Sequence, residues 1–522
     1  MSEATKPGGT YQTLDEQRER LSPAEERFER IRQTVGLFLG PIVFLALFFI
    51  PLPLEPAQQA LAAVWGFVIV YWLTEPIPIP VSAVLGLAMC VLFGVASAEA
   101  VFGAFASDTI FLFIGAFIIA QAMMTHGLDR RFAFRVLSIP GVSNSTYGII
   151  VAFGAIAAIL SAFISNTATA AMLLPIGLGM MGVLAGLVSD QAEGDRDPSR
   201  LRFGTALMLM IAYGASVGGL ITPIGSPPNL IGIGFIEDQI GTTISFFTWT
   251  IMALPIVILM FLALCVILIL LNRPEVRRIS GAGEYIAEER SRLGGISAGE
   301  RNTLVAFGVA VTLWILPGIV SLIFGQESGP ASFLREHLNE GVVAILAAAL
   351  LFILPISWSE RRFTMNWNEA VRIDWGTILL FGAGITLGKL LSDTGLAKTI
   401  GNGITNALGV TSLLAVSILA VVVAILISET TSNTASVGIF VPIIIPIAVA
   451  AGVQPLLPAL AAIFGASYGF MLPVSTPPNA IVYGSGMIPI TKMVRSGVVF
   501  DIIGAVLIVT GVTIMAQLIG LV

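Results

Sequence analysis

Charged side chains are scarce in this chain, at 11% of its 522 residues, whereas 56% of the residues are hydrophobic. A soluble globular domain carries about 25% charged residues, so the composition excludes that class of protein. Apolar stretches of about 20 residues, long enough to cross a bilayer as a helix, recur along the whole sequence. The sequence therefore predicts an all-α, polytopic protein embedded in the lipid bilayer of a cell membrane.

Residue types that carry out enzyme chemistry are also rare. Cys90 and Cys265 both lie in apolar segments, which favours core packing over a disulfide or a metal site. His126 and His337 fall at the ends of predicted spans and form no proton-relay chain. A membrane-embedded enzyme needs a cleft with His, Cys or paired carboxylates, and nucleic-acid, Walker A, Rossmann and zinc motifs are absent. These absences argue against an enzyme and against a nucleic-acid partner.

The first 34 residues are charged rather than apolar, so we expect no cleavable signal peptide. Within this tail, Ser22-Pro23-Ala24-Glu25 matches a capping box with proline at the first helical position. The match predicts a helix, in solvent or on the membrane surface, that leads into the first span.

The hydropathy pattern predicts eleven membrane spans and two apolar hairpins, 146–187 and 411–451, each interrupted by a polar tripeptide. Residues 226–236 and 477–488 continue two spans that are broken near their middle. The predicted spans are residues 36–55, 58–74, 79–97, 106–126, 202–220, 246–271, 303–324, 341–357, 375–394, 456–473 and 497–521.

Arginine and lysine residues set the predicted orientation by the positive-inside rule. With the N-terminus inside, the long inner loops each carry two or more basic residues, whereas the outer loops carry at most one, such as Lys398. We therefore expect a cytoplasmic N-terminus and an external C-terminus. The predicted organisation is a cytoplasmic tail (1–34), a first half (36–271), a cytoplasmic linker (272–302) and a second half (303–522).

The tripeptide Ser-Asn-Thr occurs twice, each time inside an apolar hairpin. The copies are Ser165-Asn166-Thr167 and Ser432-Asn433-Thr434, and a Pro-Pro-Asn follows each copy, at 227–229 and 477–479. Unpaired polar groups at bilayer depth cost several kcal/mol. Matching interruptions in the two halves of a membrane protein therefore indicate the binding site of a transporter.

Further matches extend this repeat. Residues 109–113 match residues 377–381, and Gly214-Ala215-Ser216 matches Gly465-Ala466-Ser467. In the predicted orientation the first hairpin opens inward and the second opens outward. The sequence thus predicts an inverted-topology repeat, with the two motif sets meeting near the midplane.

The motif residues offer neutral oxygen and nitrogen groups. Ser and Thr give hydroxyls, and Asn gives an amide oxygen and two donors. A loop between half-helices also exposes N–H groups that favour an anion and carbonyls that favour a cation. No Lys or Arg lies within either motif cluster, and a dianion held without any cation would be costly at this depth. Bound Na⁺ is the compensation that the residue types favour.

Glu429 precedes the second motif within an apolar run. An intramembrane carboxylate is a functional candidate by default. A buried, hydrogen-bonded brace is the alternative interpretation, and the sequence leaves both open.

These motifs resemble those of the divalent anion/sodium symporter family, the INDY-type transporters of solute carrier family 13, over nearly the whole chain from about residue 36. The resemblance implies a homodimer in which each protomer has a scaffold domain and a transport domain that moves as an elevator. It implies substrate contacts from Ser165, Asn166, Thr167, Ser226, Ser432, Asn433, Thr434, Thr476 and Pro477. It implies one Na⁺ site from Ser161, Ser165, Asn166 and Gly225 and another from Ser428, Thr431, Asn433 and Ser475.

The expected function is Na⁺-coupled symport of C4-dicarboxylates such as succinate, malate and fumarate. The resemblance favours dicarboxylates over sulfate, because no large soluble insertion interrupts the chain, unlike some sulfate-type members of that family. Na⁺-independent dicarboxylate exchange, citrate or sulfate transport, and a passive channel remain as alternatives.

Overall fold

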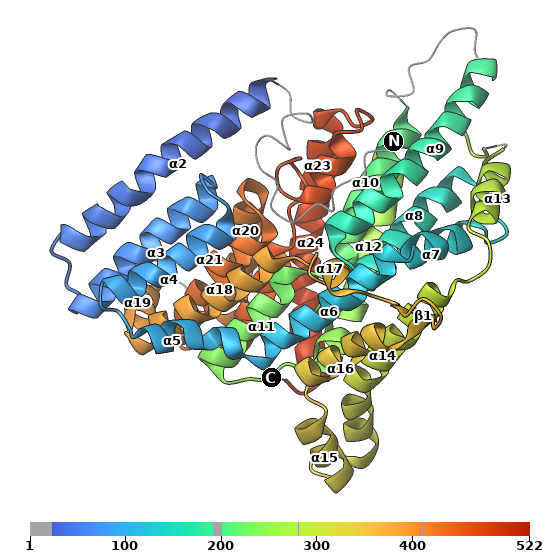
Figure 1. The fold of residues 1–522 in the computed structure, drawn as a ribbon. Coiled ribbons are helices and arrows are strands. Elements are labelled where there is room, and N and C mark those ends of the chain that lie inside the picture. The colour runs from blue at the N-terminus through green and yellow to red at the C-terminus, as the bar shows by residue number, and fades with distance from the viewer. Residues whose placement is uncertain (1–22, 192–200, 280, 410, 522) are drawn as a thin grey trace.

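The structure, a computed structural model, describes residues 23–191, 201–279, 281–409 and 411–521 and is almost entirely helical, as the sequence predicts. Within these residues the one sheet is an antiparallel pair, β1 (Pro355–Ser357) and β2 (Arg362–Phe363). Helices α2, α3 and α4 lie side by side at the left edge of the molecule, and α15 projects at the bottom of the view (Figure 1).

The first half of the chain contains both long helices and short connecting helices. Its elements are α2 (Pro23–Phe49), α3 (Pro56–Thr74), α4 (Ile79–Leu92), α5 (Ala98–Phe102), the 3-10 helix η1 (Gly103–Ala106), α6 (Asp108–Thr125), α7 (Leu128–Leu137), α8 (Thr146–Ser161), α9 (Asn166–Gln191), α10 (Arg202–Gly218), α11 (Pro227–Ile240), α12 (Phe246–Leu271) and α13 (Ala282–Arg292).

The second half has the same mixture of long and short helices. Its helices are α14 (Ala298–Phe324), α15 (Gly329–His337), α16 (Glu340–Ile353), α17 (Trp367–Ala370), α18 (Trp375–Asp393), α19 (Leu396–Leu408), α20 (Leu413–Thr430), α21 (Asn433–Ala450), α22 (Leu456–Ala466), α23 (Pro477–Tyr483) and α24 (Ile490–Leu518).

Ten helices of the described residues are long and apolar enough to cross a membrane, or up to eleven if the bent pair α15 and α16 forms one span. Three of the ten, α9, α20 and α21, belong to the two predicted hairpins. The number of crossings therefore depends on how the hairpins lie in the bilayer, and the count of eleven spans stays a prediction.

The predicted boundaries of the first span, 36–55, are wrong. Residues on both sides of position 36 belong to α2, which begins at Pro23 and ends at Phe49, ahead of Pro51. The predicted tail helix and first span are therefore one continuous helix, because nothing between them breaks the backbone hydrogen bonding. Ser22 of the capping-box pattern lies outside the described residues.

Three other predicted spans extend too far. The span predicted at 79–97 ends as a helix at Leu92, and Gly94 then turns the chain with φ = 72°. The span predicted at 341–357 ends as a helix at Ile353, and residues 355–357 form β1. The span predicted at 456–473 ends at Ala466, where an irregular segment begins. In all three places apolar residues continue past the helix end, so hydropathy alone does not locate it.

The short helices α7 and α19 directly follow α6 and α18 and were not predicted from hydropathy. Gly127 and Gly395 make these turns with φ of 70° and 76°, a left-handed conformation that residues with a Cβ rarely adopt. The matching Gly-Leu pairs at 127–128 and 395–396 thus mark the same turn in both halves.

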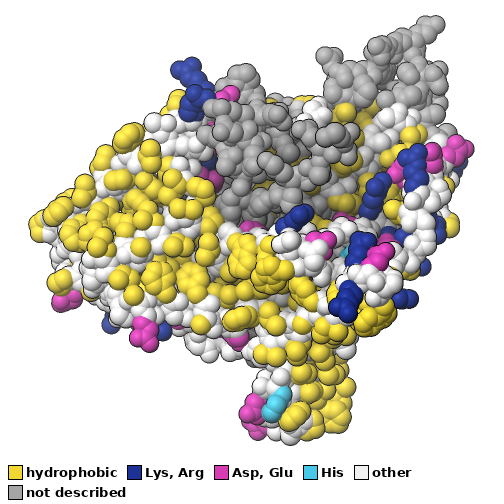
Figure 2. All heavy atoms as spheres, viewed as in Figure 1, with side chains coloured by type: hydrophobic (Ala, Val, Ile, Leu, Met, Phe, Trp, Pro, Cys, Tyr) yellow, Lys and Arg dark blue, Asp and Glu magenta, His cyan; other side chains and the backbone are white. Residues whose placement is uncertain are grey.

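Much of the visible surface in Figure 2 is hydrophobic, especially over α2 to α5 and α19. On α2, Phe38 is 64% exposed and Phe49 is 73% exposed. Water-soluble monomers rarely expose large contiguous apolar patches. This surface therefore faces lipid or another protein chain.

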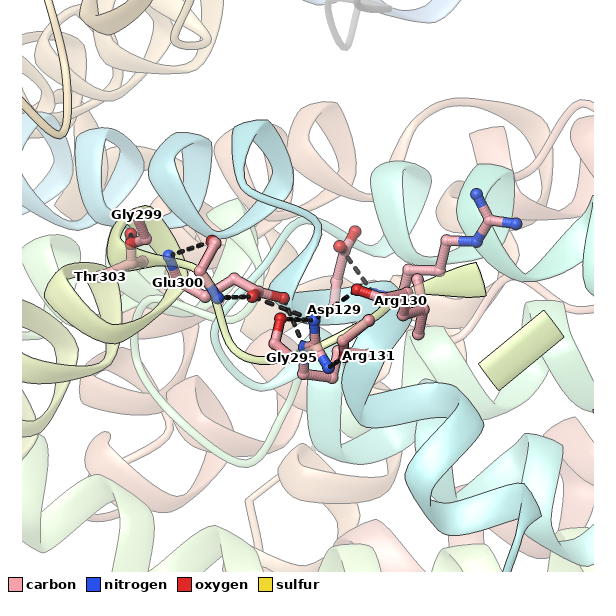
Figure 3. Close-up of polar contacts among 10 residues, drawn as sticks. Asp129, Arg130, Arg131, Gly295, Gly299, Glu300 and Thr303 are labelled. Carbon is pink, nitrogen blue, oxygen red and sulfur yellow. Dashed lines mark hydrogen bonds and ion pairs between the residues drawn. The ribbon is translucent and has the colours of Figure 1, made fainter. Parts of the chain in front are cut away.

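A cluster of ion pairs connects α7 to the start of α14 (Figure 3). Arg131 donates to both carboxylate oxygens of Glu300, at 2.5 and 3.1 Å. The same guanidinium also donates to the carbonyl oxygens of residues 293, 294 and 295, at 2.9 to 3.0 Å. Arg131 thereby joins the end of the linker segment to the helix that follows it, α14.

We expect Arg131→Ala to destabilise the protein by about 3 kcal/mol, because Glu300, with a side chain 5% exposed, would lose its cationic partner. Arg131→Lys should keep only part of the stability that Arg131 provides, since one ammonium group cannot reach the carboxylate and three carbonyls. The measurement is the unfolding temperature in detergent. Arg130→Ala is the matched control, because its ion pair with Glu289 is half exposed and worth little. Equal unfolding temperatures for the Arg131→Ala and Arg130→Ala variants would contradict the account.

Asp129, beside this cluster, is predicted to make stability depend on pH. Burial raises the pKa of its carboxyl to about 6, against a backbone hydrogen bond from Arg130 that lowers it. The folded state then binds the proton more tightly than the unfolded chain, whose Asp pKa is about 4, so stability rises as pH falls from about 6 to about 4. Asp129→Asn should raise the unfolding temperature at neutral pH, and its advantage over the parent should shrink at low pH. A constant difference at every pH would refute this assignment.

Candidate functional site

The first Ser-Asn-Thr motif lies where α8 and α9 are interrupted. α8 ends at Ser161 and α9 begins at Asn166, so residues 162–165 form the break. The hydroxyl of Ser161 donates to Asn166 Oδ1 across it. Ser165 Oγ accepts the N–H of Ala168 at 3.2 Å and so caps α9. The hydrogen bond between Ser161 and Asn166 brings two predicted Na⁺ ligands into one cluster.

Gly225, a third predicted Na⁺ ligand, lies against the same break. A Cβ placed on Gly225 would lie 2.6 Å from Gly219 O, 2.9 Å from Ser161 O and 3.0 Å from Ala162 O. Only glycine permits this close approach. Thr222 ties the two segments together by donating its hydroxyl to Ala162 O. Carbonyl oxygens from two chain breaks are therefore gathered around Gly225.

The second motif has the same local arrangement. α20 ends at Thr430 and α21 begins at Asn433. Ser428 Oγ lies 2.7 Å from Asn433 Oδ1 and 2.7 Å from Ala466 O. Asn433 Nδ2 donates to Ser467 O at 3.4 Å. The pair Ser428 and Asn433 thus matches the pair Ser161 and Asn166, five residues apart in each half.

Asn229 and Asn479, the last residues of the two Pro-Pro-Asn motifs, brace the broken helices. In each half the amide Nδ2 donates to the carbonyls ten and seven residues earlier, at 2.8 and 2.8 Å for Asn229 and at 3.0 and 3.1 Å for Asn479. Both side chains are fully buried. The duplication of the motif was visible in the sequence, but we predicted no bracing role for these two residues.

Four helices begin at a motif: α9 at Asn166, α11 after Ser226, α21 at Asn433 and α23 after Thr476. Helix α9 packs against α23, and α11 packs against α21. Each half-helix therefore lies beside the motif helix of the other half. Because helix N-termini present free N–H groups and a positive dipole end, this arrangement suits an anion.

The remaining predicted substrate contacts lie at these helix starts. Ser432 Oγ accepts the N–H of Ala435 at 3.2 Å, and Thr476 Oγ1 accepts the N–H of Asn479 at 3.3 Å. These two hydroxyls therefore cap α21 and α23. The other predicted contacts in the same four starts are Thr167, Thr434, Ser226 and Pro477.

The tip of the second hairpin is bonded to α2 and α3. Thr431 Oγ1 donates to Trp72 O at 2.9 Å. Arg32 Nη1 donates to Leu73 O and Thr430 O, both at 3.3 Å. The hydroxyl of Thr431, a predicted Na⁺ ligand, is thus directed at α3 rather than at the rest of its predicted ligand set.

Glu429 is 2% exposed and is held by three donors. Its Oε1 accepts the N–H groups of Phe470 and Met471 at 2.5 and 2.9 Å. Its Oε2 accepts the hydroxyl of Ser475, another predicted Na⁺ ligand, at 2.6 Å. Glu429 is therefore a brace between the hairpin and the break after α22.

The comparison with protein families identifies a match over residues 32–522 to the sodium:sulfate symporter transmembrane region. Among curated proteins, the chain is similar to the sodium-dependent dicarboxylate transporter SdcS of Staphylococcus saprophyticus, with 33% identity over 93% of this chain and 92% of the relative. It has the same identity to SdcS of Staphylococcus aureus strain USA300, over 91% and 90% of the two chains.

Two solved structures are similar in fold. The YdaH transporter of Alcanivorax borkumensis aligns with a TM-score of 0.52 and 13% identity, over 94% of this chain and 98% of that one. MtrF of Neisseria gonorrhoeae, described within a class of antimetabolite efflux pumps, aligns with a TM-score of 0.50 and 14% identity, over 95% and 97%. At these identities the likeness concerns the fold alone.

Removing either asparagine brace is expected to destabilise the protein. Asn229→Ala or Asn479→Ala removes the side-chain donor of one buried carbonyl, of Gly219 or Gly469, and one of two donors to a second carbonyl, of Thr222 or Leu472, at about 1–3 kcal/mol for each variant. Asn229→Asp should be at least as damaging, because a carboxylate cannot donate to them. The unfolding temperature in detergent is the measurement, with exposed Asn402→Ala as the control. If the variants that lack a brace unfolded at the same temperature as the control, these hydrogen bonds would be unimportant for stability.

Proposed function

Because the chain belongs to the sodium:sulfate symporter family, it is a membrane transporter and not an enzyme, and we propose that it carries C4-dicarboxylates such as succinate, malate and fumarate together with Na⁺. Its curated relatives bear the name sodium-dependent dicarboxylate transporter. The observation that carries the proposal is the duplicated break, in which Ser161 with Asn166 and Ser428 with Asn433 form the same hydrogen-bonded pair.

Each break would hold one transported Na⁺. The ligands would be Ser161, Ser165, Asn166 and Gly225 at the first break, and Ser428, Thr431, Asn433 and Ser475 at the second. Carbonyl, amide and hydroxyl oxygens are hard ligands that suit such a cation. The close carbonyls around Gly225 support the first site most directly.

The dianion would lie between the two Ser-Asn-Thr motifs. Helix starts from both halves would donate N–H and hydroxyl groups to its carboxylates. No Lys or Arg lies in either motif, so the two Na⁺ ions would supply the neutralising charge. Substrate affinity should then depend on Na⁺, which couples the two solutes.

We further propose that transport follows an elevator movement of inverted repeats in a homodimer, with the N-terminus cytoplasmic and the C-terminus outside. In that orientation the C-terminal end of α3 is at the inner boundary. The hydrogen bonds that join Arg32 and the carbonyl of Trp72 to the tip of the outward-opening hairpin would then be made when the transport domain is displaced inward. An elevator cycle would have to break them.

Two other functions of the same family remain distinct alternatives. Na⁺-independent dicarboxylate exchange would use the same hairpins without coupled cations. Transport of citrate or sulfate would change the anion and leave the Na⁺ sites in place.

The test is uptake of labelled succinate into proteoliposomes, with an inward Na⁺ gradient or with choline, empty or preloaded with succinate. We expect uptake into empty vesicles that requires Na⁺. Uptake that ignores Na⁺ but requires internal succinate would identify an exchanger, and competition by unlabelled citrate or sulfate would define the anion.

Asn166→Ala and Asn433→Ala should each reduce Na⁺-driven uptake by at least about 100-fold, because each removes the side chain that joins a Na⁺ site to the anion site. Exposed Asn402→Ala, at equal abundance in the vesicles, should transport normally. Normal uptake by either motif variant would invalidate its site.

A further inference from the structure

Helix α24 approaches the irregular segment after α22 through one face. A Cβ on Gly497 would lie 2.6 Å from Met471 Cα, and a Cβ on Gly504 would lie 2.7 Å from Tyr468 Cδ1. Residues 497, 501 and 504 share a helix face, because they are spaced by four and three. Asp501 is therefore placed at the centre of this contact.

The contact brings Asp501 beside Glu429. Glu429 accepts the N–H groups of Phe470 and Met471, the segment on which Gly497 packs. The carboxyl of Glu429 is the acidic neighbour of Asp501. Two carboxylates from α20 and α24 thus face one another inside the protein.

Asp501 has no donor for its charge. Its side chain is buried, with the residue 6% exposed, and within the described part of the chain neither carboxylate oxygen has a hydrogen-bond partner. The hydroxyl of Tyr468 nearby is also buried and unpartnered. Two adjacent buried carboxylates with only three donors, all on Glu429, repel each other unless a shared proton or a cation joins them.

The neighbouring helices supply no such cation. The helices with the most extensive described contacts to α24 are α12, α20 and α22, and the ionisable side chains of these three helices are Cys265 and Glu429. Tyr213 of α10 stacks on Phe500, and its hydroxyl donates to the carbonyls of Phe470 and Met493. On α24 itself, Arg495 donates to Leu271 O.

We propose that Asp501 and Glu429 bind a further Na⁺, in addition to the two at the hairpin breaks. Carboxylate oxygens are hard ligands, which suits an alkali cation. This inference rests on the proposed Na⁺-coupled function and deepens it. Because two Na⁺ balance a dianion, this third Na⁺ makes each cycle carry one net positive charge, so membrane voltage drives uptake.

The test is equilibrium binding of labelled Na⁺ to the purified protein in lipid nanodiscs without substrate. Wild type should bind one more Na⁺ than Asp501→Asn. The Asn variant keeps the shape of the side chain and removes its charge, and the exposed Asp393→Asn is the matched control. Glu429→Gln should lose the same Na⁺. Equal binding by wild type and Asp501→Asn would overturn the site.

Transport stoichiometry gives a second reading that is independent of binding. At fixed Na⁺ and succinate gradients, net succinate flux in wild type should stop at the voltage set by three Na⁺ per dianion, whereas flux in Asp501→Asn, with two Na⁺ per dianion and no net charge moved, should not respond to voltage. Coupling of only two Na⁺ by wild type, or loss of a coupled proton instead of a Na⁺ in the variant, would overturn the proposal.

These outcomes separate the two proposals. If wild type bound no Na⁺, both the proposed function and the added site would be refuted. If wild type were Na⁺-dependent and Asp501→Asn bound and coupled the same number of Na⁺, the Asp501 site alone would be refuted.

Discussion

Backbone N–H and carbonyl groups at bilayer depth must find partners within the protein, and this requirement shapes the structure around its helix breaks, two in each half. In each half, a helix that stops inside the apolar core leaves carbonyls that would otherwise be unpaired. Asn229 and Asn479 satisfy some of them through pairs of hydrogen bonds. Around Gly225, Gly219 O and Ala162 O already accept Asn229 Nδ2 and the Thr222 hydroxyl, and a cation there would use their second lone pairs together with Ser161 O.

The same requirement connects stability with function. A break whose backbone polar groups were all hydrogen-bonded would be stable but unable to bind a ligand. A break whose polar groups were all unpaired would unfold locally. The asparagine braces fix the positions of the free oxygens while Ser161 and Ser428 hold Asn166 and Asn433 in place. Because no basic side chain lies in the motifs, the charges that complete the proposed site are carried by the solutes themselves. Binding of anion and cation would then be mutually dependent.

The sequence predicted the helical class and the position of both breaks, because a polar tripeptide inside an apolar run is costly in a continuous lipid-embedded helix. Helices α9 and α21 indeed begin at Asn166 and Asn433. Contacts between distant parts of the chain could not be read in this way. The bond between Arg32 and Thr430 joins residues 398 positions apart. No role was predicted for Asp501, because the sequence of a long apolar helix does not show which residue lies beside its one carboxylate. The neighbour is seen only when α24 is placed beside the segment after α22.

The most direct measurement is a cryo-EM structure of the protein in lipid nanodiscs with succinate and Na⁺. The account predicts density for the dianion between Ser165-Asn166-Thr167 and Ser432-Asn433-Thr434, with cation density beside Gly225. Succinate bound away from both motifs, with the two breaks free of ligand, would contradict it.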